Sequence, residues 1–445
     1  MNLWSRLRQS FWFIPALLCL AAIILAESLI YIDQRIGDAD LGALGALITR
    51  VGESGSRDLL GAIAGSMLTV ASTTFSITIA VLALSSSTYG PRLVRNFMAD
   101  RGNQFVLGIF VATFLYSLMV LRSIRVLSDS SPGDYFVPHL AVNVAVLLAV
   151  LSIAVLVYFI HHISDSVQVW TLAEQVRADL LGAVDRLYPE DASEADGEGT
   201  GGPAAEKVAD RDGAALTSVE TGYVQGVDVA SLLAFAAEHD LVVDLRVRPG
   251  EYVAPGAVVA VLRSAHPVDE NGRRSIRRAI RVGSARTPEK DVEFPALLLE
   301  EMAVRALSPG TNDPYTAINA LDNLATGLVA LAGRPVPSPY RYDAQGMLRV
   351  IAPRASLIDV LEHVLDAMRF YAVAHPTVLH RTLDLIAQVG GAAHDPTLRP
   401  RLDAHVRDIV DAFSATSPQG RDLEELNRHA SRVRRELSAG REPHA

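Results

Sequence analysis

Four apolar segments of membrane-spanning length lie within the first 160 residues: 12–32, 59–84, 105–121 and 137–160. A bilayer core about 30 Å thick requires roughly 20 apolar residues in helical form. Lipid offers no partner to an unpaired backbone group, so each segment must be a helix. The sequence therefore predicts an α-helical membrane protein with four transmembrane helices near its N-terminus.

The first segment has an alternative interpretation as a secretory signal peptide, because Arg6 and Arg8 precede it. Its apolar run is long for a cleavable signal, and no small-x-small cleavage site closes it. We therefore expect it to be retained as a span.

Orientation is inferred from the arginines of the short loops. Their counts on the two sides are equal, but the first loop is net acidic, and the long region after Ile160 contains no cysteine. These features favour a multi-pass protein of the inner (plasma) membrane whose N- and C-termini are both cytoplasmic.

The second segment carries a stripe of hydroxyl side chains at spacings of three and four residues, formed by Ser66, Thr69, Thr73 and Ser76. Small and hydroxyl residues allow close packing between membrane helices. A hydroxyl stripe can equally line a hydrated path, so these residues are pore-lining candidates. No charge lies at the middle of a span, which argues against a proton-coupled transporter.

The remainder predicts a cytoplasmic α+β domain with a small β-barrel-like module and a C-terminal helical region. The strands of the module resemble the hammerhead barrel of biotinyl and lipoyl carriers, without the carrier lysine. The expected boundaries are 1–163 for the transmembrane domain, 164–188 for an extension of the fourth helix, 189–215 for an acidic flexible linker, 216–285 for the β module and 286–445 for the mainly helical domain.

A proline- and glycine-rich turn at 308–314 separates two predicted helices. A proline–glycine pair ends the first helix, and Asp313 followed by proline begins the second. This explanation does not obviously require Asn312 and Thr316. The candidate ligand-binding residues are therefore Arg286, Asn312, Asp313 and Thr316.

Several longer strings occur together in the chain: SFWFIP at 10–15, AGSMLTV at 64–70, YGPRLVRNF at 89–97, FIHHI at 159–163 and RALSPGTNDP at 305–314. By these strings nearly the whole chain resembles the bacterial family of predicted membrane proteins known as domain of unknown function 2254 (DUF2254). The resemblance implies four spans followed by a cytoplasmic domain in a bacterial membrane protein, and it implies no activity.

The chain carries no nucleotide-binding loop, nucleophile elbow or zinc signature, and its scattered histidines, among them His363 and His380, are expected to be ordinary surface or core residues. We therefore expect no enzyme, no cofactor and no metal. The formal net charge of −10 makes nucleic acid an unsuitable partner.

The first hypothesis is a homo-oligomeric channel or pore-like protein in the lipid bilayer, passing an ion or small solute, with a cytoplasmic regulatory domain. The alternative is a membrane-anchored scaffold or sensor that binds a ligand or protein.

Overall fold

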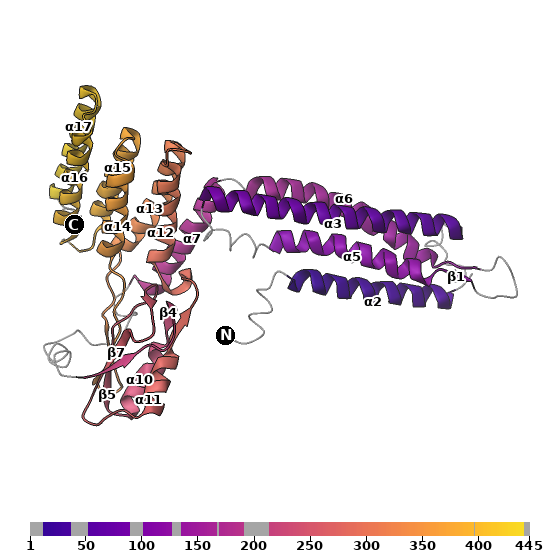
Figure 1. The fold of residues 1–445 in the computed structure, drawn as a ribbon, viewed down its shortest axis with the longest axis horizontal. Coiled ribbons are helices and arrows are strands. Elements are labelled where there is room, and N and C mark those ends of the chain that lie inside the picture. The colour runs from indigo at the N-terminus through magenta and orange to yellow at the C-terminus, as the bar shows by residue number, and fades with distance from the viewer. Residues whose placement is uncertain are drawn as a thin grey trace. The chain divides into compact units, whose positions relative to one another are not determined.

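The computed structural model describes residues 12–36, 52–89, 101–126, 135–166, 169–190, 213–395 and 397–439. The chain divides into two compact units, Met1–Gln168 and Val169–Ala445, and each is described by itself (Figure 1). Most of the predicted acidic linker, residues 191–212, lies outside the described residues.

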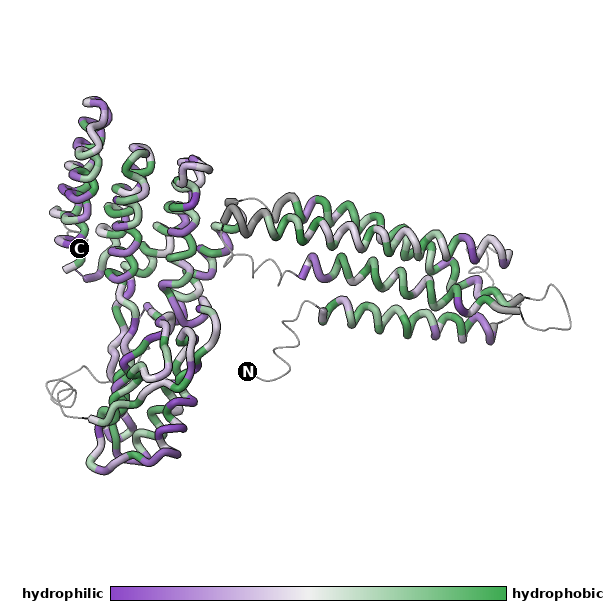
Figure 2. Tube along the Cα trace, viewed as in Figure 1, coloured by the Kyte–Doolittle hydropathy of each residue, from purple (hydrophilic) through white to green (hydrophobic). Residues whose placement is uncertain are grey.

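Unit 1 contains the four long apolar helices that the sequence predicts (Figure 2). They are α2 (Phe13–Ile36), α3 (Glu53–Tyr89), α5 (Arg101–Ser123) and α6 (His139–Ser166). Helix α5 packs against the other three. In the apolar stretch of α5, 56% of the residues are buried, whereas the share is 22% in each of the other three helices. Helix α5 is therefore the central helix of the unit.

Close contact between α2 and α5 depends on Gly108. A Cβ atom added at Gly108 would lie 2.7 Å from Cδ1 of Leu18 and 3.1 Å from Cα of Pro15. Small residues permit this approach of two backbones in a membrane. Ala26 and Ile30 of α2 also belong to the buried core of the unit, which is the packing expected of a retained span.

Hydrogen bonds join the ends of the helices in unit 1. The carboxylate of Asp33, near the end of α2, accepts bonds from the N–H groups of Leu140 (3.2 Å) and Ala141 (3.1 Å) at the start of α6. The Tyr116 hydroxyl of α5 donates to the carbonyl of Ala141 at 2.9 Å. Beside these ends, β1 (Arg125–Val126) pairs with β2 (Tyr135–Phe136). The end of α2 and the start of α6 therefore lie together, as alternating spans require.

Unit 2 contains two sheets. The five-stranded sheet has the order β3-β7-β5-β10-β9, and the three-stranded sheet has the order β6-β4-β8. The strands are β3 (Ala214–Thr217), β4 (Gly222–Val227), β5 (Leu241–Leu245), β6 (Tyr252–Val253), β7 (Val258–Ser264), β8 (Ile280–Gly283), β9 (Tyr340–Tyr342) and β10 (Leu348–Ile351).

The β-barrel-like module predicted for 216–285 is not confirmed, because the described strands form two open sheets. The larger sheet is completed by β9 and β10, which come from residues 340–351, and β10 pairs with β5 in parallel. Strand β3 also begins at Ala214, inside the predicted linker. Local turn patterns identified most strands but could not show that a distant segment joins them.

Two short helices contribute to the core of the β region. They are α10 (Val229–Glu238) and α11 (Glu270–Ala279), and both begin with an aspartate N-cap. Leu232 of α10 and Ile276 of α11 are buried in one cluster with Val243 of β5 and Val350 of β10. This cluster spans segments more than 100 residues apart, so the β region folds as one body.

The helical part of unit 2 contains α7 (Val169–Leu187), α12 (Glu293–Ala306), α13 (Pro314–Ala332), α14 (Leu357–Tyr371), α15 (Pro376–Ala392), α16 (Leu398–Ala415) and α17 (Gly420–Ala439), and a 3-10 turn, η2 (Pro288–Lys290), precedes α12. Val176, Leu180 and Val184 form the buried stripe of α7, which packs against α12 and α13 of the same chain. Residues 167–168 lie outside the described residues, so the expected continuity of α6 with α7 stays a prediction.

Candidate functional site

The hydroxyl stripe lies on the side of α3 that faces away from its own bundle. Ser66, Thr69, Thr73 and Ser76 are all exposed. At about 100° per residue, the buried side of the helix is roughly opposite to them. That buried side is formed by Leu60, Ile63, Met67 and Ala71. The stripe is therefore not packed within the protomer.

The local bonding of the stripe shows what it can contact. The Thr69 hydroxyl donates to the carbonyl of Gly65 at 2.9 Å, and the Thr73 hydroxyl donates to that of Thr69 at 3.0 Å. These donors are satisfied within the helix, while their oxygens can still accept hydrogen bonds. Among the described residues, no atom beyond the adjacent residues and the helix's own backbone lies within 4 Å of a Cβ added at Gly61 or Gly65. The face is thus open and able to receive water or another helix.

The turn between α12 and α13 accounts for three of the predicted ligand-binding residues. Asp313 caps α13 by accepting bonds from the N–H (3.1 Å) and the hydroxyl (2.6 Å) of Thr316, and these bonds lower the pKa of Asp313. Asn312 has φ of +47°, a left-handed conformation that asparagine tolerates. Each residue therefore has a local structural role, and the ligand-binding role stays a prediction.

Arg286, the fourth predicted residue, is not brought together with the other three. It lies before the N-terminus of α12, whereas the turn follows the C-terminus of α12. The helix has 14 residues, which at about 1.5 Å each separate its ends by about 20 Å. One ligand of ordinary size cannot contact both groups.

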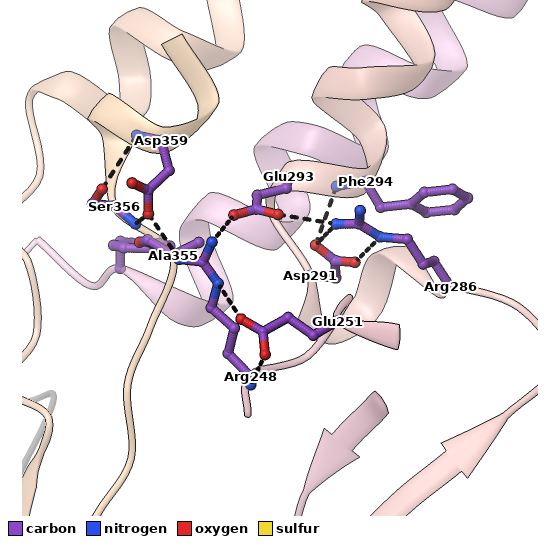
Figure 3. Close-up of polar contacts among 10 residues, drawn as sticks. Arg248, Glu251, Arg286, Asp291, Glu293, Phe294, Ala355, Ser356 and Asp359 are labelled. Carbon is purple, nitrogen blue, oxygen red and sulfur yellow. Dashed lines mark hydrogen bonds and ion pairs between the residues drawn. The ribbon is translucent and has the colours of Figure 1, made fainter. Parts of the chain in front are cut away.

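Arg286 instead belongs to a network of charged side chains (Figure 3). Its Nε is 2.6 Å from Oδ2 of Asp291, and its Nη2 is 2.8 Å from Oδ1 of Asp291 and 3.2 Å from Oε2 of Glu293. The Asp291 side chain is 4% exposed and also accepts a bond from the N–H of Phe294 at 3.2 Å. This two-pronged pair neutralises a buried carboxylate and fixes the start of α12.

Arg248, which follows β5, extends the network (Figure 3). Its guanidinium is 2.9 Å from Oε1 of Glu293, 2.8 Å from Oδ2 of Asp359 and 3.2 Å from Oε1 of Glu251. Asp359 forms a capping box with Ser356 at the start of α14. The network therefore ties the loop after β5 to the first turns of both α12 and α14.

A cavity of about 140 Å³ lies beside this network. Arg248 and Asp291 line it, and so does Tyr188, whose buried hydroxyl donates to the carbonyl of Ala355. Burial raises the pKa of Tyr188 to about 12, so this phenol remains neutral at physiological pH. Three further cations also line the cavity: Lys290, Arg341 and Arg354.

The sequence analysis did not identify the cavity, because its residues come from six separate segments. The available signal was weak: short basic and proline-containing loops directly follow the β5 and β10 segments, at 246–249 and 352–355. Only the parallel pairing of these two strands brings the loops together.

A histidine pair was also missed. Nδ1 of His380 on α15 lies 2.8 Å from Nδ1 of His429 on α17, and Nε2 of His429 lies 2.9 Å from Oδ1 of Asp384. Burial lowers the pKa of His380, and the charge of His429 adds to this effect. No group of three or more His, Cys, Asp or Glu residues that could hold a metal ion occurs among the described residues.

Comparison with known proteins identifies relatives of most of the chain. The family described as "Predicted membrane protein (DUF2254)" matches residues 8–388. The uncharacterized proteins MT1328 and Rv1290c of two Mycobacterium tuberculosis strains, and Mb1321c of Mycobacterium bovis, are each 33% identical over 363 residues. Each match covers 80% of this chain and 68% of the relative. No solved structure matches the chain. With its four apolar helices and this match, the chain belongs to the DUF2254 family of predicted membrane proteins.

Proposed function

We propose that the protein is a homo-oligomeric channel or pore-like protein that passes an ion or small solute and is not an enzyme. The observation that carries the proposal is the outward direction of the hydroxyl stripe on α3. The exposed side chains of α6 are mostly large and apolar, among them Val150, Ile153 and Val157. The exposed side of α3 instead carries the hydroxyl stripe between large apolar side chains such as Leu68 and Ile77. Lipid tails suit the exposed face of α6, whereas the α3 face suits water or a second protein surface.

The path is proposed to lie between copies of the chain. Phe110 and Val120 of α5 are fully buried in the core of unit 1, which also contains buried polar side chains, among them Thr113 and Ser117 of α5 and Ser152 of α6. The exposed hydroxyl stripe of α3 lies outside this core, so a path lined by the stripe must lie between copies. Several copies arranged with α3 innermost would place Ser66, Thr69 and Thr73 around a common axis.

Orientation completes the proposal. The acidic first loop and the long C-terminal region without cysteine favour an inner-membrane protein with both termini in the cytoplasm. In this arrangement unit 2 is cytoplasmic and serves as the regulatory domain. Attaching a membrane-impermeant label to single cysteines in loops of intact spheroplasts tests this orientation.

Solute flux through reconstituted protein tests the pore. Protein in liposomes is expected to pass potassium, chloride or a small neutral solute under voltage, tension or altered pH. Thr73→Phe places a bulky ring on the α3 face and should lower this flux. The matched control, Val150→Phe on the exposed face of α6, should leave it unchanged. The absence of flux under all these conditions, or equal flux from both variants, contradicts the proposal.

The second candidate is a membrane-anchored sensor whose unit 2 binds a ligand. The cavity beside Arg248 and Tyr188 favours it, because this cavity is lined by several cations and by apolar side chains. The two candidates are distinguished by flux: a sensor without a pore binds its ligand and passes no solute.

A further inference from the structure

The cavity in unit 2 lies where the carboxyl ends of two parallel strands meet. Strands β5 and β10 pair in parallel, with Val350 opposite Val243. The segments that follow them, Val247–Pro249 and Ala352–Ala355, both line the cavity. In open sheets with parallel strands, ligands bind in the crevice outside the carboxyl ends of the strands. The other strand pairs of this sheet are antiparallel, so the rule applies to the β5–β10 pair alone, and the cavity with its lining carries the argument for a ligand site.

The cavity has more positive than negative charge. Asp291 is its one acidic lining residue, and Arg286 already neutralises it from outside the cavity. Arg248 is likewise balanced by carboxylates. Lys290 and Arg354 form no ion pair with a described residue, and Arg354 donates to the carbonyl of Leu187. Within the described part of the chain, neither cation is held in an ion pair, although the charge of Lys290 contributes to the lowered pKa of Asp228.

The remaining walls are apolar. Val227, Leu245 and Val247 come from β4, the end of β5 and the residues that follow it, and Val292 precedes α12. The Tyr188 ring is 2% exposed and its hydroxyl is already bonded, so it adds a further apolar surface. A fully hydrated inorganic anion would leave these walls without a partner.

A larger cavity of about 280 Å³ in unit 2 lacks this charge surplus. Its two arginines are paired, since Arg334 contacts Asp185 and Arg401 contacts Glu362. A ligand there would gain little from charge. The smaller cavity is therefore the stronger candidate.

We infer that the cavity of unit 2 binds a small organic anion whose short apolar body packs against Val247 and Leu245 and whose charged head contacts Lys290 and Arg354. The inference deepens the sensor candidate and does not depend on the pore, because flux and ligand binding are measured separately. Carboxylates and phosphate monoesters share the required chemistry, and arginine and lysine bind both.

Binding to the full-length protein in a neutral detergent tests the inference, with calorimetry as the readout. The probes are octanoate, hexyl phosphate, inorganic phosphate and 1-octanol. One or both organic anions are expected to bind at least tenfold more tightly than inorganic phosphate or octanol, and the tighter of the two identifies the head group. Lys290→Glu, at an exposed side chain, should weaken that binding at least about tenfold, because it removes one charge-assisted hydrogen bond and places a negative charge beside the anion.

Two further variants keep the test decisive. Arg274→Glu changes charge equally on the exposed side of α11 and should bind like the native protein. Val247→Phe fills the cavity and should abolish binding while Lys290 is intact. The inference is overturned if neither organic anion binds, if inorganic phosphate binds as tightly, or if Arg274→Glu weakens binding as much as Lys290→Glu does.

Discussion

Replacing Glu300 by glutamine is expected to stabilise unit 2 at alkaline pH and to change it little at acidic pH. Glu300 lies on α12 and is 8% exposed, and its Oε2 has no hydrogen-bond partner. Its Oε1 lies 3.7 Å from Nε2 of the exposed His363 imidazole on α14. Burial, assisted by the charge of Glu301, raises the pKa of Glu300 from 4.5 to about 7.

The size and sign of the effect follow from this shift. The folded protein holds the Glu300 proton more tightly than the unfolded chain does. The free energy of unfolding is therefore not reduced by Glu300 below pH 4.5, and it falls as pH rises from 4.5 towards 7. At about 1.4 kcal/mol for each unit of pKa, the loss is about 3 kcal/mol at pH 8.5. Glutamine carries no charge at any pH, so Glu300→Gln avoids most of this loss.

Hydrogen exchange of the α12 amides provides the assay, using native and variant protein in neutral detergent at pH 5 and at pH 8.5. The difference between the two proteins at each pH removes the intrinsic pH dependence of exchange. Glu424→Gln, at an exposed position on α17, is the control and should show no pH-dependent difference. A protection gain in Glu300→Gln that is equal at both pH values, or larger at pH 5, would refute the reasoning.

Three further substitutions test contacts within unit 2, each by the free energy of unfolding from denaturant titration. Arg286→Met leaves the buried carboxylate of Asp291 without its ion pair and should lower the free energy of unfolding by about 3–5 kcal/mol. Adding Asp291→Leu removes that carboxylate and should recover part of the loss. Gly327→Ala places a Cβ 2.2 Å from Cδ2 of Leu180 and should cost about 1–3 kcal/mol at the α7–α13 contact. Asn312→Val should cost about 1–2 kcal/mol at its positive φ, whereas Asn312→Gly should be tolerated.

The sequence predicted the four apolar helices because length and apolarity alone determine a span. It also predicted the turn at 308–314, where Asp313 caps α13 and Pro314 begins it, because capping is a local property. The helix expected over 164–188 contains α7 (Val169–Leu187), although its partner helices α12 and α13 could not be inferred.

Features that depend on pairing between distant segments could not be predicted from the sequence. The parallel contact of β10 with β5 joins residues about 100 positions apart, and no local pattern indicates it. The cavity and the network around Arg248 both depend on that contact and were not predicted. Arg286 was identified, but its partner Asp291 lies only five residues later, so the sequence could not separate a buried ion pair from a ligand-binding arginine.

The proposed pore requires water at the α3 face, and thiol accessibility measures whether water reaches it. With Cys19→Ser as background, Thr73→Cys and the α6 control Val157→Cys each carry one thiol within the spans. After reconstitution, a charged membrane-impermeant methanethiosulfonate should modify Cys at position 73 and leave position 157 unmodified. If position 73 remains unreactive, or if both positions react equally, the α3 stripe does not line a hydrated path.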